Sequence, residues 1–128
     1  MYTVGDFLIR LQNAYMAGKK QVEYPESKMV ASIGKVLEKE GYVKSSKLKA
    51  QSSKKVLEIE LKYENKMPAI SSIKLVSKPS IRHYINKDNV KRAVDKHGIG
   101  ILSTSRGVMS TRQAQKDGVG GELICKIY

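Results

Sequence analysis

Residues 55–63 read KVLEIELKY and alternate apolar with charged side chains. One face of this segment carries Leu57, Ile59, Leu61 and Tyr63, and the other carries Glu58, Glu60 and Lys62. A period of two is typical of an antiparallel strand that is buried on one face and wet on the other. The segment therefore predicts a half-buried antiparallel strand.

Helical patterns and turn residues surround this strand on its N-terminal side. Thr3 with Asp6, and later Ser27, are residues that begin helices, while Gly18 and Gly41 are residues that end them. The predicted elements are a helix from Thr3 to Gly18, a strand over 20–24, a helix from Ser27 to Gly41, and strands over 42–49 and 55–63. This order, α-β-α-β-β, predicts an N-terminal α/β unit over residues 1–65.

The remaining residues, 66–128, predict a second unit that is mostly β with one main helix. Asn86 is placed to cap that helix, whose apolar face carries Val90, Ala93, Val94 and His97 before Gly98 ends it. Ser110 and Gln113 form a capping box that opens a short helical turn. Strands are predicted over 69–76, 100–103 and 122–128. The fold class is α+β, with the N-terminal unit packed against the C-terminal one.

The charge balance points to a polyanion as partner. The chain has 24 basic and 12 acidic residues, a net charge of +12, and a pI near 9.8. Residues 1–64 carry 12 basic and 8 acidic side chains, and residues 65–128 carry 12 and 4, so the net charges are +4 and +8. Solubility alone asks for only about 2–8 net charges in a small domain, whereas nucleic-acid binders show this excess. The second half is the better candidate for contact with phosphate.

Several classes of function find no support in the sequence. The single cysteine, Cys125, cannot form an internal disulfide, which fits a reducing compartment. No apolar run is long enough to span a membrane, and the first residues lack the pattern of a secretory signal. A cytoplasmic location is expected, although the sequence also fits an organelle.

Catalytic and metal chemistry is equally unsupported. His83 and His97 are too far from each other and from Cys125 for metal-ligand spacing. Cys125 alternates with apolar residues and is predicted to be a buried strand residue rather than a reactive thiol. Residues 98–100 and 118–121 are glycine clusters without the strand–loop–helix order of a nucleotide site, so they predict turns or close backbone approaches. We expect no enzyme activity, no cofactor, no metal and no small-molecule substrate.

One motif remains, STSRGVM over residues 103–109, with GGE following at 120–122. Three adjacent hydroxyl residues at a strand end could donate to phosphates, ribose hydroxyls and base edges, and a glycine lets an RNA backbone come close. An ordinary Ser/Thr turn explains the same residues equally well. An enzyme using these serines is a weaker alternative, because no base and no G-x-S-x-G pattern accompany them.

At this motif the sequence resembles the universal family of small-subunit ribosomal protein eight, in its bacterial and organellar form. The resemblance is most specific in GIGILSTSRGVM at 98–109 and GVGGELIC at 118–125. Weaker matches are Ser77-Lys78-Pro79 with Arg82 and Tyr84, residues 25–28, and residues 37–42. Departures from the family pattern are Ser80, His83 and Leu11-Gln12-Asn13, and the last of these weakens any rRNA contact through the first helix.

The resemblance implies a structural component of the small ribosomal subunit that binds the central domain of 16S-type rRNA and supports subunit assembly and translation. Its partners would be that rRNA and neighbouring ribosomal proteins. By resemblance, the RNA-binding residues are Ser103, Thr104, Ser105, Gly107, Gly121, Glu122 and Tyr84. Charge and neighbourhood add Arg82, Lys78, Lys87 and Arg106.

A free-standing RNA-binding translational regulator would use the same residues and is the alternative function. Either role depends on one structural expectation: the hydroxyl segment near residue 104 and the carboxylate of Glu122 must lie together on one surface.

Overall fold

A computed structural model describes residues 3–93 and 98–128. The described residues form two compact units, 3–71 and 72–128. The division between these units lies a few residues after the domain boundary predicted at residue 65. At that predicted boundary the chain forms a short hairpin of β4 (Tyr63–Glu64) and β5 (Met67–Pro68), which is part of the first unit.

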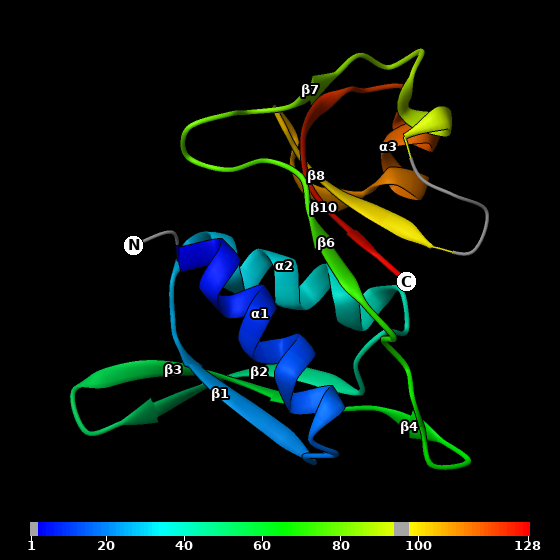
Figure 1. Cartoon of the computed structure of the whole chain (residues 1–128). Coiled ribbons are helices and arrows are strands. Elements are labelled where there is room, and N and C mark those ends of the chain that lie inside the picture. Colours follow the sequence, from blue (N-terminus) through cyan, green and yellow to red (C-terminus); the bar gives the residue numbers. More distant parts are fainter. Residues whose placement is uncertain (1–2, 94–97) are drawn as a thin grey trace. The chain divides into compact units, whose positions relative to one another are not determined.

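The first unit has the predicted order of helices and strands. Its elements are α1 (Thr3–Met16), β1 (Gln21–Pro25), α2 (Lys28–Lys39), β2 (Ser45–Gln51) and β3 (Lys54–Glu60). β3 covers most of the strand predicted over 55–63, but it ends at Glu60, and Tyr63 belongs to β4. β3 occupies the middle of an antiparallel sheet with the order β1-β3-β2. Figure 1 shows α1 and α2 side by side next to this sheet.

Each helix buries one face, whose apolar residues recur at the three- and four-residue spacing of a helix. The buried residues of α1 are Gly5, Phe7, Leu8, Leu11, Ala14 and Tyr15, and those of α2 are Val30, Ile33, Gly34 and Leu37. Gly34 brings α2 against the sheet, because a Cβ at this position would lie 2.6 Å from Ser46 Oγ. The Ser27 hydroxyl accepts a hydrogen bond from Val30 N at 3.2 Å, which confirms it as the helix cap.

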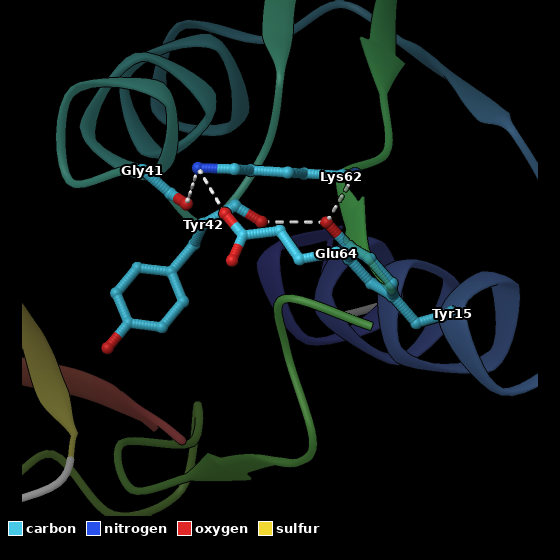
Figure 2. Close-up of polar contacts among 5 residues, drawn as sticks. All are labelled: Tyr15, Gly41, Tyr42, Lys62 and Glu64. Atoms are coloured by element: carbon cyan, nitrogen blue, oxygen red, sulfur yellow. Dashed lines mark hydrogen bonds and ion pairs between the residues drawn. The ribbon is translucent and has the colours of Figure 1, made fainter. Parts of the chain in front are cut away.

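A buried tyrosine hydroxyl joins the end of α2 to the end of β3 (Figure 2). Tyr15 donates to the carbonyl of Tyr42 at 2.7 Å and accepts from Lys62 N at 3.1 Å. Lys62 Nζ donates to the carbonyl of Gly41 at 3.4 Å and lies 3.6 Å from Glu64 Oε1. Burial raises the pKa of Tyr15 above its ordinary value. The hydroxyl therefore stays neutral at physiological pH and serves as a structural hydrogen-bond bridge.

The second unit is built on a five-stranded sheet. Its elements are β6 (Ile73–Leu75), β7 (Tyr84–Ile85), a 3-10 turn (Val90–Arg92), β8 (Ile99–Thr104), β9 (Gly107–Ser110), α3 (Thr111–Asp117) and β10 (Gly121–Ile127). The main path of the sheet is β6-β10-β8-β9, and β7 also pairs with β10. A small core of Val90, Leu102, Met109, Ala114 and Leu123 lies against it.

The capping residues predicted for the short helical turn are correct in part. Ser110 caps α3 by accepting from Gln113 N at 3.1 Å. The side chain of Gln113 does not complete the box: it donates to Asp117 Oδ1 at 2.9 Å. Gly118 ends the helix with a φ of +67°. Within residues 72–93 and 98–128, the α-helix is therefore α3.

The main helix predicted from Asn86 to His97 is wrong for the residues that the structure describes. After β7 the chain makes a turn in which Asn86 Oδ1 accepts from Asn89 N at 3.1 Å, followed by the 3-10 turn at 90–92. Asn and Asp favour such turns because their side chains compete with helical hydrogen bonds. Val90, which lies on the apolar face predicted for this helix, is nevertheless buried. Val94 and His97 lie outside the described residues.

Candidate nucleic-acid interface

The two segments expected to form one surface are neighbours in the sheet of the second unit. Glu122, in β10, pairs with Ser103 in β8 on one side and with Tyr84 in β7 on the other. Directly opposed residues of antiparallel strands send their side chains to the same face. Tyr84, Glu122 and Ser103 therefore form one row across three strands, which we call the central row.

Two glycines allow the strands to come this close. A Cβ at Gly121 would lie 2.3 Å from the carbonyl oxygen of Ser103 and 3.1 Å from Thr104 Cγ2. A Cβ at Gly120 would lie 2.4 Å from the carbonyl oxygen of Ile85. Within the glycine cluster predicted at 118–121, these distances confirm a close backbone approach at Gly120 and Gly121, and they explain why side chains are absent at both positions.

The hydroxyl segment ends in a tight turn between β8 and β9. The hydroxyl of Thr104 donates to the carbonyl of Gly107 at 2.8 Å and accepts from Arg106 N at 3.1 Å. Gly107 has a φ of +111°, in the region that side chains disfavour. The hydrogen of Thr104 is thus used to shape the turn, whereas Ser105 and Arg106 are exposed at its tip.

Glu122 is held by an arginine from the loop that precedes β7. Arg82 Nη1 lies 3.0 Å from Glu122 Oε2, and the side chains are 47% and 15% exposed. A carboxylate has about four acceptor sites on two oxygens, so this ion pair leaves acceptor capacity for a ligand. Sequence analysis named both residues but not their pairing, which gives Arg82 a positioning role beside its charge.

A buried serine fixes the loop that carries Arg82. Ser77 is fully buried, and its hydroxyl donates to the carbonyl of Leu123 at 2.7 Å and accepts from His83 N at 3.0 Å. Leu123 N in turn donates to the carbonyl of His83 at 2.8 Å. Sequence analysis missed this role for Ser77. The only signal was a small hydroxyl residue at the end of a strand, before the turn at Pro79.

The other predicted basic residues lie in turns of the second unit. Lys78 begins a tight turn and bridges to Ile81, Lys87 lies in the turn after β7, and Arg106 lies at the β8–β9 turn. All three are exposed, and no ion pair with them is found in residues 3–93 and 98–128. Tyr84 is 72% exposed, so a ring and its hydroxyl face solvent at one end of the central row.

Neither the cysteine nor a cluster of metal-ligating side chains offers a second chemical centre within the described residues. Cys125 is buried, and burial raises the pKa of its thiol to about 12, so it is an inert packing residue as predicted. No group of three His, Cys, Asp or Glu side chains suited to a metal ion occurs within 3–93 and 98–128. Across the same residues, no helix is both long and apolar enough to cross a membrane.

Comparison with known proteins agrees with the resemblance seen in the sequence. The model of the family described as "Ribosomal protein S8" matches residues 2–128. Proteins named "Small ribosomal subunit protein uS8" are similar along nearly their whole length. The one from Syntrophobacter fumaroxidans is 42% identical over 98% of this chain and 96% of its own. Those from Hydrogenovibrio crunogenus and Nitrosomonas eutropha are 41% and 43% identical, covering 97% and 95% of this chain and 95% and 93% of their own.

Proposed function

Because the chain belongs to the ribosomal protein S8 family, we propose that it is a structural, non-enzymatic component of the small ribosomal subunit that binds the central domain of the rRNA. In this role it would hold one fold of the rRNA during subunit assembly, beside neighbouring ribosomal proteins. The names of its relatives support the ribosomal role, and the features of the second unit support the RNA contact.

The central row is the observation that carries the proposal. A hydroxyl from Ser103, a carboxylate from Glu122 and an exposed aromatic ring from Tyr84 stand side by side, next to the exposed turn at Ser105. Sequence-selective RNA binding uses this combination: hydroxyls and carboxylates reach ribose and base edges, and rings stack on unpaired bases. Within the row, Glu122 is held by Arg82, and the backbone of Ser103 packs closely against Gly121.

Positive charge around the row would supply the rest of the affinity. Residues 72–128 hold 11 basic and 4 acidic side chains, a net charge of +7. Lysines and arginines release counterions from phosphates, so this part of the affinity falls with salt and is the same for every RNA. Lys78, Lys87 and Arg106 are the candidates, and selectivity would come from the central row and Ser105.

Replacing Ser105 by alanine tests this division of roles. We expect Ser105→Ala to weaken binding to the cognate rRNA stem about fivefold, the value of one hydrogen bond of roughly 1 kcal/mol. Binding to unrelated duplex RNA should hardly change. Fluorescence anisotropy with both RNAs measures the two dissociation constants.

Lys87→Ala is the matched control for that experiment. It should weaken binding to both RNAs alike and lower the dependence of log K on log salt by about one contact. If Ser105→Ala reduced both affinities equally, the turn would contribute no selectivity. If the unchanged protein bound duplex as tightly as the rRNA stem, the proposed function itself would fail.

A further inference from the structure

The net positive charge of the first unit is concentrated in one hairpin. Residues 1–71 contain 13 basic and 8 acidic side chains, a net charge of +5. Residues 44–55 contain five of those lysines and no acidic residue, so the rest of the unit, with 8 of each sign, is neutral. We call residues 44–55 the basic hairpin; its lysines are Lys44, Lys47, Lys49, Lys54 and Lys55.

Two of these lysines are neutralised by the sheet itself. Lys49 Nζ lies 2.7 Å from Glu58 Oε2, and Lys44 Nζ lies 3.4 Å from Glu60 Oε1. The hydrogen bond and charge of Glu58 raise the pKa of Lys49. Within the described part of the chain, Lys47, Lys54 and Lys55 form no ion pair. Three uncompensated charges therefore remain.

The strands hold these charges on a regular frame that extends past the rest of the sheet. β2 and β3 pair in continuous register from Ser45↔Glu60 to Gln51↔Lys54, whereas β1 stops at the Pro25↔Val56 pair. The end of the hairpin that carries Lys54 and Lys55 is thus a two-stranded arm (Figure 1). Lys47 and Lys49 are two residues apart along β2, so they leave the same face about 7 Å from each other.

Protection of an exposed strand edge does not account for this arrangement. Lysine on an edge strand prevents pairing with another sheet, and Lys47 and Lys49 on β2 suffice for that. Lys54 and Lys55 add charge on the partner strand, at the arm's end. Lys54 and Lys55 are consecutive in β3, so they leave opposite faces of the arm. Point charges spread along an extended element suit a repeated anion, and lysine binds phosphate as a point charge without demanding a base sequence.

We propose that the basic hairpin is a second RNA contact, which binds rRNA phosphates without sequence preference through Lys47, Lys54 and Lys55. This inference rests on the proposed function. It assigns the selective contact to the second unit and a purely electrostatic contact to the first.

The test uses the full chain and a transcript of the complete small-subunit rRNA. The variant replaces Lys47, Lys54 and Lys55 by Gln. Three lost contacts at about 0.7–0.9 each should make the slope of log K against log salt about two units shallower and lower affinity roughly tenfold at physiological salt. The control replaces Lys28, Lys35 and Lys39, three exposed lysines of α2, by Gln. It makes the same charge change in the same unit and should have less than half the effect.

A second variant works in the opposite direction. Glu58→Gln keeps the side-chain shape but frees Lys49, so the slope should become steeper by about one contact. The proposal would be overturned if the two triple variants had equal effects. It would also be overturned if neither the hairpin triple variant nor Glu58→Gln changed the slope. Hairpin-dependent binding of polyglutamate with an unchanged RNA slope would assign the hairpin to an acidic protein and overturn it too.

The proposed function is judged separately in the same samples. If the hairpin variants fail to change the slope while Ser105→Ala still loses preference for the cognate stem, only the hairpin contact is wrong. If the unchanged protein showed no preference for the cognate stem over unrelated duplex RNA, the selective site itself would be refuted. Thermal unfolding of every variant confirms that each is folded. This is expected because Ser105 and the substituted lysines are exposed, and Gln keeps the shape of the half-buried Glu58.

Discussion

Ser77 is the residue on which the geometry of the candidate interface most directly depends. Its hydroxyl is shared between the carbonyl of Leu123 in β10 and the amide of His83, just before Tyr84. Ser77→Ala would take this partner from both backbone groups, at a position where the serine itself is fully buried. We expect a loss of about 1–3 kcal/mol in the free energy of unfolding, measured by urea denaturation.

Ser80→Ala is the matched control for Ser77. Ser80 is exposed in the turn that follows, so its hydroxyl is solvated and its removal should change stability by less than about 0.5 kcal/mol. RNA affinity of Ser77→Ala should also fall, because the loop carrying Arg82 loses its anchor. If Ser77→Ala were as stable as Ser80→Ala and kept full RNA affinity, the hydrogen bonds of Ser77 would have no part in positioning Arg82.

At the scale of single residues, the sequence indicated which side chains lie near each other better than it indicated the hydrogen bonds and ion pairs between them. The predicted neighbourhood of the segment near residue 104 with Glu122 is confirmed, since Ser103 and Glu122 are paired. The Arg82–Glu122 ion pair and the two hydrogen bonds of the Ser77 hydroxyl were not predicted. Both depend on strand register between residues about 40 positions apart, which no local pattern encodes.

At the scale of elements, the contact between β8 and β10 depends on Gly121. Its backbone lies so close to Ser103 that a Cβ would be 2.3 Å from a carbonyl oxygen, and a backbone atom cannot move aside cheaply. Gly121→Ala should therefore push the strands apart and separate Ser103 from Glu122. We expect a destabilisation of about 1–3 kcal/mol and weaker binding to the cognate stem under conditions where the variant is folded.

Gly118→Ala distinguishes strand separation from simple loss of stability. Gly118 has a φ of +67° and no atom within 4 Å of its Cβ position, so alanine there costs backbone strain of about 1–2 kcal/mol without moving a strand. Its RNA affinity, measured while folded, should equal that of the unchanged protein. Similar affinities for the two variants would mean that the spacing of β8 and β10 is irrelevant to binding.

Elements with a strong period were predicted well, and the exception has a local cause. The alternation in β3 and the apolar faces of α1 and α2 agree with the structure because burial and periodicity coincide there. From Asn86 onward the spacing was helical, but the polar residues 86–89 form a hydrogen-bonded turn. Side-chain competition for the backbone outweighed a short apolar pattern.

At the scale of the whole molecule, stability at alkaline pH should report on the buried thiol of β10. Cys125 has an ordinary pKa of 9.0, which burial raises to about 12 in the folded chain. The unfolded chain therefore loses the proton first as pH rises. The stability that this neutral thiol contributes is complete below pH 9 and declines by about 1.4 kcal/mol per pH unit until the folded pKa is reached.

Comparison with Cys125→Ala isolates this effect from the titration of lysines and tyrosines, which both proteins share. Between pH 8 and pH 10, the free energy of unfolding of the unchanged protein should fall by about 1.4 kcal/mol more than that of the variant. Urea denaturation at the two pH values measures both differences. Equal declines would mean that the thiol ionises while the chain is folded, which would require water to reach Cys125 beneath the sheet. The interpretation of Cys125 as an inert packing residue would then be wrong. A charged thiolate two residues from Leu123 would also disturb the backbone to which Ser77 is bonded.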